Sequence, residues 1–366
     1  MNNKLTQTLL GLIIITGMIV APVQCIESGY NSLKLCATAL VPTLLPFFIC
    51  VKLLMNTGFA TKIGKPLEHI MRPLFNLPGE AAFAFVMGII SGYPMGAKCA
   101  VQLLDNKICT HKEAERIVCF CNNSGPLFLI GSVGVVMLGN KTAGILLFTA
   151  HFLSAITVGI IFSLIRRPEA VNINTYQNNS DGTLAEAVTE GINLILYVCG
   201  FVIFFNIFST VLECFGLYYI LSYPFMFLGI DNNIIKALIA GIVEMTGGIS
   251  KLSAIYTGNL KLPLISLLTG IGGISVIVQV IGVTQKHNLS KKKFVLAKLT
   301  QGVLSFIYTL LLLKLPITVN TAVIMSHNFT FKGSLMCGIL LVFISITAIF
   351  TASTIIKIIA WILKKS

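Results

Sequence analysis

Two apolar segments interrupted by glycine have the residue types and spacing best suited to binding a solute inside a membrane. The first reads Gly88-Ile-Ile-Ser-Gly-Tyr-Pro-Met-Gly-Ala-Lys98, and the second reads Gly241-Ile-Val-Glu-Met-Thr-Gly-Gly-Ile-Ser-Lys251. Glycine and proline interrupt helices, and a helix end inside a membrane leaves N–H groups that favour an anion. The pair predicts a site for a small anionic solute, with these candidate residues: Ser91, Gly92, Tyr93, Pro94, Lys98, Glu244, Thr246 and Gly247.

Each interrupted segment is followed by an apolar helix with polar residues at its centre. Asn122, Asn123 and Ser124 precede a proline in the first helix, and Ser275 and Gln279 lie in the second. Amide side chains donate and accept hydrogen bonds, which suits a polar solute of any charge. These residues complete the predicted binding site. The alternative is that they form helix–helix hydrogen bonds and that the glycines only kink or pack the helices.

Three kinds of ionisable residue have two interpretations each. Glu244 lies in an apolar context, where a carboxylate can carry a proton, bind a cation or contact substrate, unless a shallow position keeps it hydrated. Lys98 and Lys251 end the two interrupted segments, where they either attract an anion or extend to the headgroups. His151 lies on an apolar helix and either relays protons or packs with a hydrogen-bonded partner.

The composition excludes a water-soluble protein. The chain has 366 residues, of which 55% are hydrophobic and only 11% are charged, and its mean hydropathy is +0.90. The net charge of +13 fits basic residues that orient membrane helices better than it fits a nucleic-acid partner. The sequence contains no nucleotide-binding loop, metal-ligand set or catalytic motif, so we expect neither an enzyme nor a bound cofactor.

The hydropathy pattern predicts an all-α polytopic membrane protein with about eight transmembrane helices and two re-entrant hairpins in an inverted repeat. The hairpins would be residues 81–97 and 234–249, while residues 60–77 and 215–229 would lie at the membrane surface. Cytoplasmic termini would place most Lys and Arg residues on the cytoplasmic side, and this charge distribution fits either two re-entrant hairpins or two full spans at these positions. The expected spans are Leu5–Val20, Leu35–Met55, Ile117–Leu138, Ala143–Ile165, Ile192–Val211, Leu262–Val283, Phe294–Leu313 and Leu335–Leu363.

The repeat divides the chain into five regions. Residues 1–34 form an uncleaved N-terminal helix and loop, and residues 35–165 form the first repeat. Residues 166–190 are a hydrophilic linker, residues 191–315 form the second repeat, and residues 316–366 contribute a C-terminal helix. Repeats of this kind are typical of secondary transporters, in which the substrate binds between the two halves.

The interrupted segments also carry a resemblance to a known family. Ser91-Gly92-Tyr93-Pro94-Met95-Gly96-Ala97-Lys98, followed by Asn122-Asn123-Ser124-Gly125-Pro126 and Gly131, resembles the sporulation integral membrane protein family of YlbJ type. That family belongs to the nucleoside-recognition or Gate group, which is similar to concentrative nucleoside transporters. The resemblance extends from about Leu35 to the C-terminus. The second half, around Glu244 to Gly248, matches the pattern less closely.

The resemblance implies a role in endospore formation, as a transporter of dipicolinic acid in the outer forespore membrane. It further implies alternating access, coupling to sodium or to a proton, assembly as a homo-oligomer, and a transport partner in the inner forespore membrane. A secondary transporter or facilitator of a small anionic metabolite is therefore the leading hypothesis. The alternatives are a nucleoside or nucleobase carrier of the same architecture and a non-transporting membrane scaffold of the sporulating cell.

Overall fold

The computed structural model describes residues 3–164, 182–228, 231–255 and 257–314, and the regular elements in these ranges are all helical. Within them, five helical segments are long and apolar enough to cross a membrane: Pro22–Asn56, Lys141–Leu164, Leu184–Cys214, Lys261–His287 and Lys291–Lys314. Shorter apolar helices accompany them. The expected all-α polytopic membrane protein is confirmed. The predicted span Leu335–Leu363 and most of the predicted linker lie outside the described residues.

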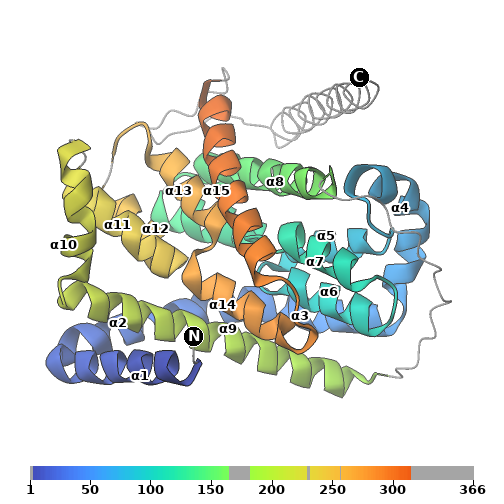
Figure 1. Cartoon of the computed structure of the whole chain (residues 1–366), viewed down its shortest axis with the longest axis horizontal. Coiled ribbons are helices and arrows are strands. Elements are labelled where there is room, and N and C mark those ends of the chain that lie inside the picture. Colours follow the sequence, from blue (N-terminus) through green and yellow to red (C-terminus); the bar gives the residue numbers. More distant parts are fainter. Residues whose placement is uncertain (1–2, 165–181, 229–230, 256, 315–366) are drawn as a thin grey trace, which may run out of the picture.

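A helical rod and one long helix form a scaffold along one side of the molecule (Figure 1). The rod consists of α2 (Pro22–Leu35), a π-helical segment η1 (Cys36–Leu40) and α3 (Val41–Asn56), and α1 (Asn3–Val20) precedes it. The long helix is α9 (Leu184–Cys214), which packs against α1, α2 and α3. The helix that contains the predicted span Leu35–Met55 begins earlier, at Pro22, because the polar stretch before Leu35 continues the helix instead of ending it.

The remaining elements form two series with the same order. After α4 (Phe59–Phe75), the first series contains α5 (Ala81–Ser91), α6 (Met95–Asp105), α7 (His111–Cys121), η2 (Leu127–Met137) and α8 (Lys141–Leu164). After α10 (Leu217–Ser222) and η3 (Tyr223–Leu228), the second contains α11 (Asn232–Val243), α12 (Met245–Ile255), α13 (Lys261–Ile271), α14 (Gly273–Thr284), η4 (Gln285–His287) and α15 (Lys291–Lys314).

The two series contact each other reciprocally. In each series the first two helices form a hairpin, α5 with α6 and α11 with α12. Helix α6 contacts α14 and α12 contacts η2, while α7 contacts α15 and α13 contacts α8. Each contact has its counterpart with the two series exchanged, as two structural repeats related by a pseudo-two-fold axis require. The hairpins lie on opposite sides of α14 and α15 (Figure 1).

Two predicted spans are interrupted helices. In the first repeat, α7 ends at Cys121 and η2 begins at Leu127, and Asn122 has an extended backbone. Proline at 126 has no N–H to continue the helical hydrogen bonds, so the chain unwinds before it. In the second repeat, Gly272 and Gly273 have φ angles of +81° and +74°, which glycine adopts readily. Each repeat thus contains one helical hairpin and one interrupted helix.

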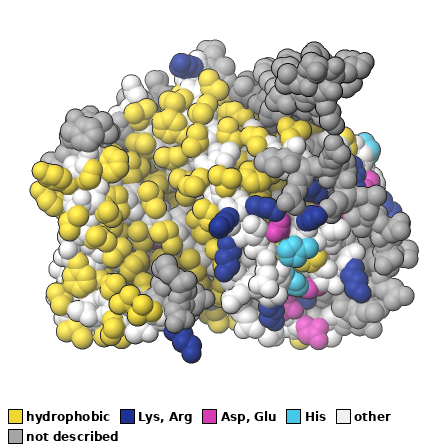
Figure 2. All heavy atoms as spheres, in the orientation of Figure 1, with side chains coloured by type: hydrophobic (Ala, Val, Ile, Leu, Met, Phe, Trp, Pro, Cys, Tyr) yellow, Lys and Arg dark blue, Asp and Glu magenta, His cyan; other side chains and the backbone are white. Residues whose placement is uncertain are grey.

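Charged side chains are distributed unevenly over the surface. Hydrophobic side chains cover much of the face in Figure 2, and charged side chains gather at the end where α6 and α7 lie. Ion pairs at that end join His287 to Asp105 and Lys293 to Glu115. A membrane-embedded surface is apolar and a wetted surface is charged, so this distribution fits a membrane protein with one strongly charged end.

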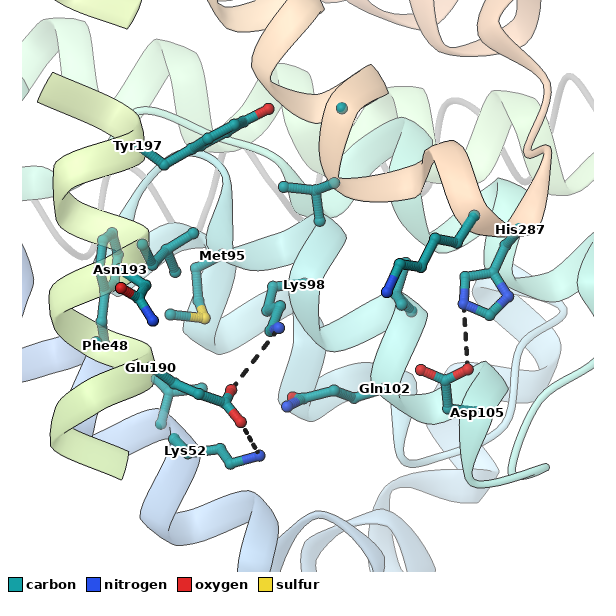
Figure 3. Close-up of a pocket in the computed structure, with 17 residues that line it drawn as sticks. Phe48, Lys52, Met95, Lys98, Gln102, Asp105, Glu190, Asn193, Tyr197 and His287 are labelled. Carbon is teal, nitrogen blue, oxygen red and sulfur yellow. Dashed lines mark ion pairs between the residues drawn. The ribbon is translucent and has the colours of Figure 1, made fainter. Parts of the chain in front are cut away.

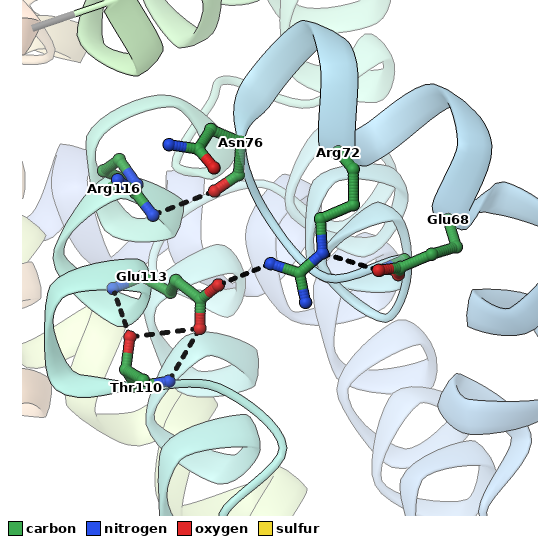
Figure 4. Close-up of polar contacts among 7 residues, drawn as sticks. Glu68, Arg72, Asn76, Thr110, Glu113 and Arg116 are labelled. Atoms are coloured by element: carbon green, nitrogen blue, oxygen red, sulfur yellow. Dashed lines mark hydrogen bonds and ion pairs between the residues drawn. The ribbon is translucent and has the colours of Figure 1, made fainter. Parts of the chain in front are cut away.

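A buried acid joins α4 to the N-terminus of α7 (Figure 4). The Arg72 guanidinium contacts Glu113 Oε1 at 2.9 Å and Glu68 Oε1 at 2.5 Å. The other Glu113 oxygen accepts the Thr110 backbone N–H at 2.9 Å, and Thr110 Oγ1 accepts the Glu113 N–H at 3.2 Å. This capping box fixes the start of α7. Arg116 of α7 also donates to the Asn76 carbonyl, so the end of α4 is held beside α7.

Candidate functional site

The two repeats enclose a small cavity at the level of the helix interruptions. Its volume is about 80 Å³, enough for a few water molecules. Apolar residues from η1, α3 and α9 form part of its wall, including Leu40, Leu44 and Val198. Six of the residues predicted from the sequence line it: Gly92, Tyr93, Ser124, Glu244, Thr246 and Gln279.

The first hairpin packs closely on the interrupted helix of its own repeat. Helix α5 ends at Ser91, Gly92 has φ +78°, and a cis Tyr93–Pro94 peptide bond leads into α6. A Cβ atom at Gly88 or at Gly96 would overlap the Cys121 carbonyl group. Glycine at these two positions therefore allows the hairpin to approach the unwound backbone and brings Tyr93 to the cavity.

The three polar residues of the first interruption have different roles. Asn122 Oδ1 accepts the Ala97 N–H at 2.8 Å near the start of α6, and its Nδ2 donates to the Val118 carbonyl. Asn123 Nδ2 donates to the Phe120 carbonyl at 2.8 Å. Both asparagines satisfy backbone groups freed by the interruption. Ser124 lines the cavity, with its Oγ 3.9 Å from the Met245 sulfur across the repeat interface.

The second hairpin presents Glu244 at the cavity. This residue is 2% exposed and lies between α11 and α12. Its Oε2 accepts the Thr246 hydroxyl at 2.5 Å and the Gly247 N–H at 2.8 Å. The carboxylate therefore caps the N-terminus of α12. This end is not free for a solute anion, because the protein's own acid occupies the position that the helix dipole favours for negative charge.

Lys298 and Gln301 of α15 are the main residues that sequence reasoning missed. Both side chains are 0% exposed. Lys298 Nζ donates to Tyr93 Oη at 2.5 Å, to the Asn122 carbonyl at 3.1 Å and to Gln301 Oε1 at 2.6 Å. Gln301 Nε2 donates to Asn123 Oδ1 at 2.8 Å. The second repeat thus supplies an ammonium group and an amide to the interruption of the first.

Lys298 Nζ donates three hydrogen bonds, all to neutral oxygens, and three donors require the protonated ammonium form of the side chain. Within the described residues it forms no ion pair, and one partner is the carbonyl of Asn122, which ends α7. The negative end of a helix dipole stabilises a cation. Tyr93 accepts a hydrogen bond from Lys298, so its own hydroxyl hydrogen can be donated to another group, and the Ser124 side chain at the cavity is one such neighbour. Lys298 is therefore placed to strengthen Tyr93 as a donor toward the cavity.

His151 contacts the same interruption. Its Nε2 lies 3.0 Å from the Ser124 N–H and accepts it, and Gln301 Nε2 lies 3.5 Å away. Since Nε2 accepts a backbone N–H, the proton of the neutral ring is on Nδ1. Nδ1 is buried without a hydrogen-bond partner among the described residues. The packed, hydrogen-bonded interpretation of His151 thus describes its surroundings better than a proton relay does.

The structure does not bring every predicted residue to the cavity. Lys98 lines a separate, charged cavity, where its Nζ lies 3.7 Å from Glu190. Ser275 Oγ accepts Gln279 Nε2 at 3.3 Å and so positions that side chain. Ser91 is buried, and its hydroxyl has no partner in the described part of the chain. Lys251 forms an exposed ion pair with Glu213.

This geometry defines a multi-pass helical membrane protein in which two repeats meet at a small, mostly apolar cavity with a few polar side chains in its wall. A family model described as Gate, nucleoside recognition, matches residues 37–165, a range that contains the first hairpin and the first interruption. The sporulation integral membrane protein YlbJ of Bacillus subtilis is 31% identical over 320 residues, covering 80% of this chain and 78% of that protein. The chain belongs to the family of this sporulation integral membrane protein.

A second relative shares a shorter region. An uncharacterized protein of Alkalihalophilus pseudofirmus is 26% identical over 160 residues, which cover 42% of this chain and 33% of that protein. This chain therefore aligns with only a third of the second relative.

Proposed function

We propose that this protein is a secondary transporter or facilitator of a small anionic metabolite. The observation that carries the proposal is the meeting of two helical hairpins and two interrupted helices, one of each from each repeat, at one small cavity whose mostly apolar wall includes the polar side chains of Tyr93, Glu244 and Gln279. Irregular backbone at membrane depth is tolerated where it lines a protein-enclosed or watery site. The buried ammonium of Lys298 behind Tyr93 favours a negatively charged solute.

Alternating access would have to widen the site. A cavity of about 80 Å³ is smaller than the several hundred Å³ that ligand pockets usually offer. We propose that the hairpin-bearing helices move relative to the α2–α3 and α9 scaffold, so that the cavity opens to one side at a time. The re-entrant position of the hairpins in the membrane is part of this proposal.

The relative's name adds a cellular setting to the proposal. Because the Bacillus subtilis protein is named a sporulation integral membrane protein, we propose that this chain acts during spore formation, in the outer forespore membrane, with cytoplasmic termini. Dipicolinic acid is the first solute to test, because a small planar dianion matches a hydroxyl and amide site next to an ammonium. A homo-oligomer and an inner-membrane partner stay predictions.

Substitutions at the cavity test the binding site. We expect Ser124→Ala with Gln279→Ala to lower uptake of labelled dipicolinate into vesicles by about tenfold or more, because two buried hydrogen-bonding groups are lost. Thr300→Ala, on an exposed face of α15, is the matched control and should transport normally. Unchanged uptake by the double variant, at normal protein level, would exclude this cavity as the substrate site.

Charge balance favours a proton over sodium as the coupling ion. A dianion that binds near Lys298 also approaches the Glu244 carboxylate, which repels it unless Glu244 is protonated. We therefore propose that Glu244 takes up a proton when the solute binds.

A side chain at position 244 that is always neutral tests whether Glu244 couples uptake to a proton. Native protein should take up dipicolinate faster when the side from which the solute enters is more acidic, whether the salt is sodium or choline chloride. Glu244→Gln should still transport but lose this response to the proton gradient, since glutamine keeps the acceptor oxygen and cannot be protonated. Uptake by native protein that requires sodium, or a pH response that survives in Glu244→Gln, would contradict the assignment.

A nucleoside or nucleobase carrier is the second candidate. The matched family model is described as nucleoside recognition, and the hydroxyl and amide groups of Ser124, Thr246 and Gln279 at the cavity could pair with a base as well as with a carboxylate. Competition experiments separate the two candidates. Inhibition of uptake by dicarboxylates but not by nucleosides supports the leading proposal, and the reverse pattern supports the second.

A further inference from the structure

A second, larger cavity lies next to the central one, and several charged side chains line it. Its volume is about 470 Å³, within the range of sites that hold small solutes. It lies between α3, α6, α9 and the end of α14 (Figure 3). Lys52, Lys98 and Lys286 line it, together with two acids, Asp105 and Glu190.

The two acids differ in how close they lie to the lysines of this cavity. Asp105 pairs with His287 at 3.1 Å, on one side of the cavity in Figure 3. Glu190 lies between two lysines, with Oε1 2.8 Å from Lys52 Nζ and Oε2 3.7 Å from Lys98 Nζ. Lys286 lines the cavity without an ion pair among the described residues. Three lysines therefore face one carboxylate that is not already paired with His287.

Successive turns of the same helices line the two cavities. On α3, Leu44 lines the central cavity and Phe48, one helical turn later, lines the charged one. On α14, Gln279 lines the central cavity and Val283 lines the charged one. Four residues make about one helical turn, or 6 Å of rise. The charged cavity is therefore the adjoining compartment on one side of the central site.

Three side chains of the charged cavity lie close along the chain to residues of the central one. Phe48, Met95 and Tyr197 line the charged cavity, and Leu44, Tyr93 and Val198 line the central one. Phe48 and Met95 are each 2% exposed. Tyr197 Oη donates to the Gln279 carbonyl at 3.2 Å, and a Cβ at Gly282 would overlap this hydroxyl. A connection between the two compartments therefore requires these packed side chains to move.

We propose that the charged cavity is a second anion-binding site, at which a dicarboxylate solute is collected before it reaches the central cavity, and that Glu190 occupies it when no solute is bound. The Glu190 carboxylate lies between Lys52 and Lys98 as one carboxylate of the solute would. A dianion displaces it because its second carboxylate also reaches Lys286. The topology expected from charge places these lysines on the cytoplasmic side. This inference rests on the proposed transport function.

The Lys52, Lys98 and Glu190 variants test the site in opposite directions. Labelled pyridine-2,6-dicarboxylate (dipicolinate) is the probe, measured by equilibrium binding to the purified protein and by uptake into vesicles. Lys52→Ala with Lys98→Ala should raise Kd and the uptake KM about tenfold at low salt, and the effect should shrink at high salt because screening weakens exposed charges. Glu190→Gln should lower Kd about threefold or more, because a competing carboxylate is removed.

A matched ion pair elsewhere supplies the control. Lys251 and Glu213 form an exposed pair away from both cavities, and Lys251→Ala or Glu213→Gln should leave Kd and KM unchanged. The inference would be overturned by weaker binding in Glu190→Gln, or by a lysine double variant that behaves like this control. It would also be overturned if the dianion did not bind to the native protein. Dianion binding that responds as expected without any uptake would contradict the transport function alone. Normal uptake with silent variants would contradict this site alone.

Discussion

Lys298→Met is expected to lower dipicolinate uptake about 100-fold while the protein stays folded. A carboxylate that accepts the Tyr93 hydroxyl would lie roughly 5 Å from the ammonium, where opposite charges attract by about 3 kcal/mol at an effective dielectric of about 20. Loss of that attraction corresponds to about two orders of magnitude in affinity. Uptake by vesicles with equal amounts of protein measures the effect.

Stability should respond differently from uptake. Methionine fills a similar volume and removes the cost of burying a charge, which offsets the three lost hydrogen bonds. The unfolding midpoint of Lys298→Met should therefore stay close to that of the native protein. Lys251→Met is the control, because that lysine is exposed and paired with Glu213. Uptake by folded Lys298→Met within about threefold of native would show that the ammonium does not act on the solute.

A double variant separates positioning from a general charge effect. If Lys298 acts by orienting and strengthening the Tyr93 hydroxyl, Tyr93→Phe removes the same interaction. The loss in Tyr93→Phe with Lys298→Met should then be much smaller than the sum of the two single losses. Additive losses would instead mean that the two groups affect the solute independently.

Gly96→Ala is expected to prevent stable folding. The added methyl group would overlap the Cys121 carbonyl and contact the Asn122 N–H, and both are backbone atoms that cannot rotate away. Overpacking of this kind costs about 1–3 kcal/mol or more. We expect a loss of folded, detergent-soluble protein, measured by size-exclusion chromatography and thermal unfolding.

Gly131→Ala is the matched control for Gly96→Ala. Gly131 lies in η2 of the same repeat, and no atom lies within 4 Å of the position of its missing Cβ. Alanine also has the higher helix propensity, so this variant should be as stable as the native protein. A Gly96→Ala protein with native stability would mean that the first hairpin does not pack on the unwound segment as described.

The paired hairpins were predictable because their signal is local. Glycine and proline in an apolar stretch mark a break wherever they occur, and the same order of elements occurs in both halves of the chain. The length of the first interruption was not predictable. Asn122, Asn123 and Ser124 were expected inside a helix, but the Asn122 and Asn123 amides replace the lost helical hydrogen bonds, and that depends on the approach of α6.

Residues that act across the repeat interface were harder to find. Lys298 lies near the start of the predicted span Phe294–Leu313 and follows the basic run Lys291–Lys293, so the charge pattern groups it with the cytoplasmic lysines and not with a binding site. The signal that could have identified it is its spacing from Gln301, because residues three apart share a helix face and both lie among apolar residues. Lys98 was assigned to the central site, but α6 turns it toward Glu190.

The most direct test of the account is uptake of labelled dipicolinate into vesicles that contain the purified native protein. We expect saturable uptake that unlabelled dicarboxylates inhibit and that Lys298→Met loses. Uptake no greater than that of empty vesicles, for dipicolinate and for a panel of nucleosides alike, with the protein shown to be folded, would contradict the transporter function. It would favour a membrane scaffold of the sporulating cell instead.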